Sequence, residues 1–247
     1  AMLKKILTTV CTVLAAAYLF LAVTAFNRKP AGRVCEDLEL VIRDTVYAGF
    51  ITQKEVISLL DKSGLNPVGK NPDATDTRAM EQALAQHPLI DGVECYKTPS
   101  GKVCVEVSQR LPILRIMSNN GENYYVDNRG KVMPVSAKCI AHVAVATGSI
   151  SQDFATRQLY PFGLFLQNDA FWNAQTEQIH VLPDNTIELV PRVGDHLIYM
   201  GKLKNYRKKL ERVRLFYEKA LNQVGWNKYS RINVEFDNQI ICTRREQ

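Results

Sequence analysis

A run of 21 residues without a charge, residues 6–26, constrains this chain more than any other feature of its sequence. As an α-helix that rises 1.5 Å per residue, the run is long enough to cross the roughly 30 Å hydrocarbon core of a bilayer. We therefore expect a single transmembrane helix over 6–26. A cleaved signal peptide is the alternative, because Val23 and Ala25 resemble the small residues of a cleavage site. The run is nevertheless longer than the roughly 7–15 apolar residues of a signal peptide, which favours a retained anchor.

Charges on the two sides of this run do not orient it. Lys4 and Lys5 precede it, and Arg28, Lys29 and Arg33 follow it, so the positive-inside rule gives no clear direction. If the N-terminus stays inside the cell, residues 1–5 form a short cytoplasmic tail. Residues 27–37 then form a polar linker, and the rest of the chain lies on the far side of the membrane.

The net charge of +6 is concentrated in one segment, residues 202–219, which carries eight Lys or Arg against Glu211 and Glu218. A general nucleic-acid binder is expected to spread basic residues and stacking aromatics across its surface. The segment is therefore interpreted as the solvated face of a helix. Binding to nucleic acid or to anionic lipid through Lys204, Lys208 and Arg212 is the alternative.

The six cysteines are scattered along the chain and do not predict a disulfide framework. Cys95 and Cys104 flank a predicted hairpin around residues 99–101. Successive strand residues face opposite sides of a sheet, so Cys104 points away from a core face that holds Cys95, Val103 and Val105. This alternation argues against a Cys95–Cys104 bond.

Residues 38–116 are predicted to form a first unit with the order strand, helix, helix, strand, strand. Leu38, Leu40 and Ile42 alternate in its first strand. Thr52 is followed three residues later by Glu55, which is the pattern of a capping box, and the helix that they begin ends near residue 64. A second helix begins after residue 76 or 77 and ends before 87–88, and strands follow over 90–96 and 103–107.

Residues 117–247 are predicted to form a strand-rich second unit. Polar turn residues separate its expected strands. An irregular helical stretch over 152–173 is expected to be interrupted at Pro161 and Gly163. The expected strands are 124–127 paired with 131–133, then 140–147, 178–182 and 186–190, and a terminal hairpin of 229–236 with 239–243.

The basic segment is predicted to be a helix that packs one apolar stripe on this sheet while its eight cations face water. The stripe recurs at steps of three and four residues, and a coiled coil is the weaker alternative because only about three heptads are present. Its positions are Leu203, Tyr206, Leu210, Val213, Tyr217, Ala220 and Val224. The predicted fold class is thus α+β: one N-terminal helix, a small β-α-α-β-β domain, and a mixed, mainly antiparallel β-domain with covering helices.

The sequence carries no motif that predicts a catalytic centre, a cofactor or a metal. None of the histidines, His87, His142, His180 and His196, has a partner at metal-ligand spacing, and phosphate-binding loops and nucleophile motifs are not found. His180 and His196 lie on strand patterns, where a surface or half-buried role is expected. Asp127 lies in a turn signal and is expected to bond the backbone of its own loop. We therefore expect a protein that is not an enzyme.

Several segments of the chain resemble the FtsQ/DivIB family of bacterial cell-division proteins, which have a POTRA domain followed by a β-domain. In the first unit the resemblance is carried by residues 50–52 at the start of the first helix, residues 87–90 before a strand, and residues 105–112 at the end of the unit. In the last of these segments Arg110 and Pro112 match the family pattern, but Gln109 stands where the family usually has an acidic residue. The segments 185–196, 225–234 and 239–244 resemble the β-domain in the form found in Bacteroidetes.

The resemblance implies a divisome scaffold of the inner membrane, with its N-terminus in the cytoplasm and its bulk in the periplasm, enriched at the division septum. It implies FtsB/DivIC-like and FtsL-like partners, other divisome components, and no nucleic acid. Docking by strand addition at the C-terminal hairpin is our hypothesis. The alternatives are a POTRA-type envelope assembly or translocation module and an anchored cell-wall enzyme. The candidate partner-binding residues are Tyr229, Arg231, Asn233, Glu235, Phe236, Gln239, Ile240, Ile241, Cys242 and Arg244.

Overall fold

The computed structural model describes residues 2–26, 34–43, 49–136 and 138–246. Helix α1 spans Met2–Phe26 and so includes residues 2–5 of the expected cytoplasmic tail. Residues 27–33 of the expected linker lie outside the described residues. No helix in the described part of the chain combines the length and the apolar character needed to cross a membrane. The membrane-spanning role of 6–26 stays a prediction.

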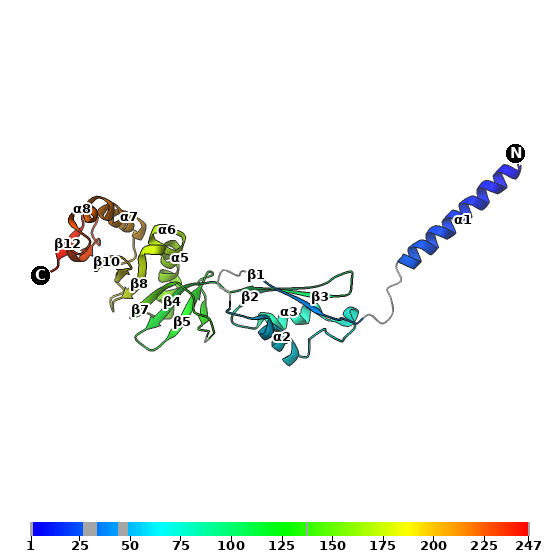
Figure 1. Cartoon of the computed structure of the whole chain (residues 1–247), viewed down its shortest axis with the longest axis horizontal. Coiled ribbons are helices and arrows are strands. Elements are labelled where there is room, and N and C mark those ends of the chain that lie inside the picture. The colour runs from blue at the N-terminus through cyan, green and yellow to red at the C-terminus, as the bar shows by residue number, and fades with distance from the viewer. Residues whose placement is uncertain (1, 27–33, 44–48, 137, 247) are drawn as a thin grey trace.

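The first unit is a three-stranded sheet covered on one face by two helices (Figure 1). Its strand order is β1-β3-β2, in which β1 pairs parallel and β2 antiparallel with the central β3. Its elements are β1 (Leu38–Arg43), α2 (Gln53–Lys62), the 3-10 turn η2 (Pro72–Ala74), α3 (Thr77–Ala85), β2 (Ile90–Lys97) and β3 (Val103–Gln109). The expected order of elements is confirmed.

Local sequence signals place both helices of this unit. Thr52 Oγ1 accepts the Glu55 N–H while the Glu55 carboxylate accepts the Thr52 N–H, which completes the predicted capping box. Asp76 caps α3 by accepting the N–H of Ala79. The apolar sides of both helices pack on the sheet through Val56, Leu60, Met80, Leu84, Val103, Val105 and Val107.

The predicted alternation of the cysteines is confirmed. Cys95 lies in the core opposite Val105, and Cys104 lies on the other face, where its thiol bonds the Glu39 carboxylate. Both thiols are free.

The second unit is built on a nine-stranded mixed sheet whose pairings are mainly antiparallel. Its strand order is β12-β11-β10-β9-β8-β7-β4-β5-β6. The strands are β4 (Pro112–Ser118), β5 (Asn123–Asp127), β6 (Val132–Pro134), β7 (Ala144–Gly148), β8 (Thr176–Val181), β9 (Ile187–Pro191), β10 (Leu197–Gly201), β11 (Tyr229–Asn233) and β12 (Ile241–Arg244). The expected division after residue 116 falls inside β4, which pairs with β5 and β7. By strand pairing the division lies between β3 and β4.

Helices cover one face of the large sheet and enclose its core (Figure 1). They are α4 (Gln152–Phe154), the π-helical turn η3 (Ala155–Leu159), α5 (Tyr160–Asn168), α6 (Ala170–Gln175), α7 (Tyr206–Phe216), the π-helical turn η4 (Tyr217–Leu221) and α8 (Asn222–Val224). The expected break at Pro161 and Gly163 is wrong. Pro161 lies in the first turn of α5, directly after the π-helical turn η3, and Gly163 lets the helix approach the Leu114 side chain.

The basic helix differs from its predicted stripe at its C-terminal end. Leu210, Val213 and Tyr217 are buried as expected, but Leu221 takes the next core position, and Val224 is exposed. The π-helical turn η4 holds more residues per turn than an α-helix and so carries Leu221 to the core side.

Candidate partner-binding site

Strand β12 is the outer strand at one end of the nine-stranded sheet, so one row of its backbone groups has no neighbouring strand among the described residues. It pairs antiparallel with β11, and the register shifts once between Tyr229 and Arg231. The terminal hairpin is shorter than predicted. β11 ends at Asn233 rather than 236, and Gln239 and Ile240 precede β12 instead of lying in it.

Hydrogen bonds at the end of β12 reveal which of its backbone groups face outward. The Arg245 N–H donates to the Lys228 carbonyl at 3.1 Å, and Ser230 Oγ donates to the Thr243 carbonyl at 3.5 Å. Thr243 and Arg245 therefore turn their backbone groups towards the side of β11. Since orientation alternates along a strand, Cys242 and Arg244 direct theirs away from the sheet.

At the other outer strands, β1, β2 and β6, side chains form hydrogen bonds with backbone groups that face away from the sheet. Gln53 Nε2 donates to the Leu40 carbonyl of β1 at 3.1 Å, and Glu81 Oε1 accepts the Cys95 N–H of β2 at 2.8 Å. On β6, Arg110 Nη2 donates to the Val132 carbonyl at 2.9 Å, and Pro134 lacks an N–H. Within the described residues, no side chain outside the paired β11 bonds the backbone of β12. Strand β12 is therefore the most open edge in the described structure.

The candidate residues divide between structural and exposed positions. Arg231 pairs with Glu188 at 2.6 Å and lies 4.4 Å from the centre of the Tyr199 ring, so it ties β11 to the sheet. Tyr229 packs near Phe216. Asn233 Oδ1 accepts the Glu235 N–H. Ile240 and Cys242 pack partly against the core, whereas Phe236, Gln239, Ile241 and Arg244 are exposed.

The prediction that all eight cations of the basic segment face water is wrong for two of them. Lys209 is buried, and its ammonium donates to the carbonyls of Met200 (2.7 Å) and Lys202 (3.0 Å) at the end of β10. Burial lowers the pKa of Lys209. Arg212 donates to three carbonyls between β11 and β12, those of Val234, Phe236 and Gln239. Both side chains hold the strands that lead to the open edge.

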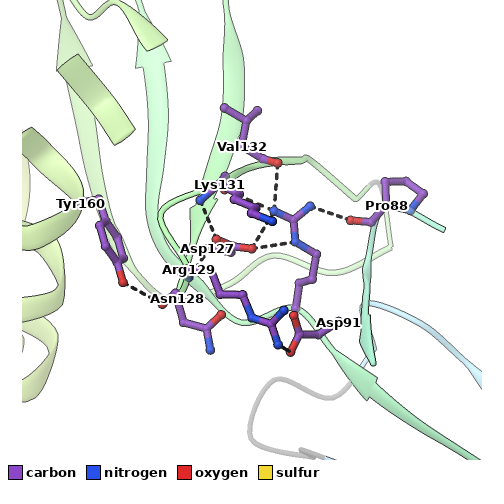
Figure 2. Close-up of polar contacts among 9 residues, drawn as sticks. Pro88, Asp91, Asp127, Asn128, Arg129, Lys131, Val132 and Tyr160 are labelled. Atoms are coloured by element: carbon purple, nitrogen blue, oxygen red, sulfur yellow. Dashed lines mark hydrogen bonds and ion pairs between the residues drawn. The ribbon is translucent and has the colours of Figure 1, made fainter. Parts of the chain in front are cut away.

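The two units meet at a junction around Asp127, which Figure 2 shows together with Pro88 and Val132. Arg110 bonds all three of these residues. Its guanidinium bonds Asp127 Oδ2, and it also donates to the carbonyls of Pro88 at 3.0 Å and Val132 at 2.9 Å. Asp127 Oδ1 accepts the N–H groups of Arg129 and Lys131, which confirms its predicted bonding to its own loop. The resemblance to the family pattern had singled out Arg110, but the ion pair between Arg110 and Asp127 was not predicted.

An apolar cluster completes the junction. Phe50 stacks edge-on against Tyr125 with ring centres 5.9 Å apart, and Met133 and Ala141 pack beside them. The Gln109 side chain accepts the buried Ile51 N–H at 3.0 Å. This gives Gln109, which departs from the family pattern, a structural role within the first unit, where it ties the end of β3 to the segment before α2.

Two of the histidines make contacts with neighbouring side chains inside the second unit. His196 is buried rather than half-buried, its Nε2 lies 2.6 Å from the Tyr217 hydroxyl, and burial lowers its pKa. His180 bonds Thr147 across neighbouring strands. Among the residues that the structure describes, no three His, Cys, Asp or Glu side chains are grouped as metal ligands.

Comparison with known families places both units. A family model described as FtsQ/DivIB, C-terminal related, matches residues 111–243, which is more than half of the chain. The chain belongs to the FtsQ/DivIB family. A POTRA-like domain model matches residues 33–108, the first unit. The boundary between the two matches falls at the division between β3 and β4. Together the two matches support a family of cell-division scaffolds. No curated protein matches the chain significantly.

Proposed function

We propose that this FtsQ/DivIB-family chain is a non-enzymatic scaffold that docks an FtsB/FtsL-like complex by strand addition to β12. The observation that carries the proposal is the contrast between edges: β1, β2 and β6 have outer backbone groups bonded by side chains, and β12 does not within the described chain. Unpaired N–H and C=O groups on such an edge supply affinity to an added strand through main-chain bonds.

The side chains of β12 supply selectivity to this edge. Ile241 and Thr243 face the side of the sheet opposite the helices, because their neighbour Cys242 packs towards the core with its pair Ile232. Ile241 is 47% exposed and offers an apolar contact there. Arg244 at the end of the strand is a charge that discourages uncontrolled pairing between copies of the chain.

We propose in addition that residues 6–26 of α1 act as the membrane anchor. Val13, Leu14, Tyr18 and Phe20 are 62–72% exposed, and exposed apolar surface on this scale requires lipid or a partner to cover it. We place the chain in the inner membrane, with its two folded units in the periplasm at the septum. Deletion of residues 2–26 should release the protein from membranes that retain the full chain after alkaline extraction.

Proline at Arg244 tests the docking edge directly. Arg244→Pro removes an outward N–H, whereas Arg244→Ala keeps that N–H and removes the same charge. The measurement is the affinity of each variant for the extracytoplasmic segments of the FtsB/FtsL-like partners, with circular dichroism to verify the fold. We expect the proline variant to lose binding and the alanine variant to keep most of it.

Two outcomes would contradict strand addition at β12. Equal binding by both variants would show that the outward N–H is not used. The second outcome combines two results: Arg244→Pro loses its fold, and a chain that ends after residue 240 still binds the partner. Together these results would show that β12 completes the sheet but does not dock the partner. An envelope assembly module, the alternative function, is instead expected to bind unfolded outer-membrane strands through its POTRA-like sheet.

A further inference from the structure

Arg212 joins the basic helix to the backbone that leads into the open edge. Its Nη1 donates to the carbonyls of Phe236 at 2.6 Å and Gln239 at 3.2 Å, and its Nη2 donates to the carbonyl of Val234 at 2.8 Å. These three carbonyls span the connection between β11 and β12. One side chain on α7 therefore fixes both ends of the segment from which β12 emerges.

Val234 also holds the β11 end of this connection, because its side chain is buried and its N–H donates to the Tyr199 carbonyl at 2.9 Å. The part of the connection nearer β12, residues 236–239, is exposed. Asn238 adopts a left-handed conformation with φ +62°, and Phe236 is 49% exposed. Apart from the Arg212 bonds, the described contacts of the segment include the Asn233 side chain, which accepts the Glu235 N–H at 2.9 Å, and partial packing of Ile240 on the core. A guanidinium presents several donors in one rigid plane and suits this task better than an ammonium does.

The neighbouring cations on the same helix behave differently. Lys208 is exposed, and no hydrogen bond or ion pair of its side chain is present among the described residues. Lys209 is bonded to the end of β10, one strand further into the sheet. The cluster of positive charge thus contains at least two residues committed to the backbone beside the edge, rather than to an anionic ligand.

We infer that Arg212 is a positioning residue for the docking edge: it holds the β11–β12 connection so that the outward groups of Cys242 and Arg244 are presented in strand geometry. The effect on a partner rests on the proposed function of β12, whereas the effect on the edge itself does not. If β12 is already ordered, binding of the partner does not have to include the entropy cost of ordering that strand.

Amide hydrogen exchange of the full chain without any partner tests the positioning role by itself. In Arg212→Ala we expect the amides of Thr243 and Arg245, which face β11, to exchange faster by about tenfold, because charge-assisted bonds that order the strand are lost. Amides in β8 and β9 should exchange as in the parent chain. Arg212→Lys should fall between the two, and the matched control Lys208→Ala should change nothing.

Affinity for the FtsB/FtsL-like segments then separates this inference from the proposed function. Weaker binding by Arg212→Ala than by Lys208→Ala, at unchanged exchange in β8 and β9, supports positioning of the docking edge. If the parent chain does not bind, the proposed function fails, and the exchange data still decide whether Arg212 orders β12. Unchanged exchange at Thr243 and Arg245 would overturn the inference. Equal acceleration throughout the second unit would overturn it too, because Arg212 would then stabilise the whole unit.

Discussion

Arg110 and Asp127 form a buried ion pair that joins the last residues of the POTRA-like domain to the first hairpin of the β-domain. Arg110 Nε and Nη2 lie 2.8 Å and 2.7 Å from Asp127 Oδ2, and the two side chains are 13% and 1% exposed. The remaining donors of Arg110 bond carbonyls on both sides of the junction. The pair therefore fixes the position of one domain on the other.

Removal of either partner should destabilise the junction strongly. Arg110→Ala leaves a buried carboxylate without its cation, and losses of this kind cost about 3–5 kcal/mol. The matched control is Arg129→Ala, because the Arg129–Asp91 pair is more exposed and such pairs contribute about 0–1 kcal/mol. Urea unfolding of the three chains measures the difference. A loss in Arg110→Ala no larger than in the control would contradict the role assigned to the pair.

A second contact at the junction makes stability depend on acid pH. The hydrogen bond from Lys138, with further bonds from Thr52, lowers the pKa of Glu55 from 4.5 to about 2. The unfolded chain therefore binds a proton at Glu55 more readily than the folded chain does. The stabilisation is present above pH 4.5 and is lost as the pH falls towards 2.

Lys138→Ala should reduce this acid sensitivity, since its main cause is removed. Unfolding free energies from pH 6 down to the lowest pH at which the chain folds measure the slope, and Lys131→Ala serves as a lysine control in the same domain. A parent slope that Lys138→Ala leaves unchanged would show that the Glu55 contact does not contribute in solution.

Gly148 occupies a position in the large sheet that no side chain fits. Its φ is +103°, and an added Cβ would meet the backbone carbonyl of Val181 on β8. Gly121 has a similar φ of +88°, but an added Cβ there meets no atom within 4 Å. Gly148→Ala should therefore lower the melting temperature far more than Gly121→Ala, which pays only backbone strain of about 1–3 kcal/mol. Similar melting temperatures would mean that β7 and β8 do not approach as the structure shows.

Short-range signals predicted the first domain well because its elements are defined by local chemistry. The capping box of Thr52 and Glu55, the cap at Asp76 and the alternation of Val103, Val105 and Val107 each involve residues close in sequence. Contacts between distant residues were harder to foresee. Strand β4 carries an apolar run that fits either domain, and only its pairing with β5 and β7 assigns it to the second.

Predictions for the candidate site failed where burial overrides the usual preference of a residue type. Lys209 and Arg212 belong to a cationic run, and charge alone suggests solvent for all of it. They are instead bound to backbone carbonyls that arrive from β10 and from the β11–β12 connection. The sequence contains no local signal of those carbonyls. The π-helical turn η4 places Leu221, instead of the expected Ala220, in the core. A pattern of steps of three and four residues cannot predict such a turn.

Amide exchange of the full chain with and without the FtsB/FtsL-like extracytoplasmic segments tests the central claim most directly. Strand addition to β12 predicts new protection at the outward amides of Cys242 and Arg244, with little change at the outer strands β1, β2 and β6. Binding that leaves Cys242 and Arg244 unprotected, or that protects β2 or β6 instead, would contradict docking at β12.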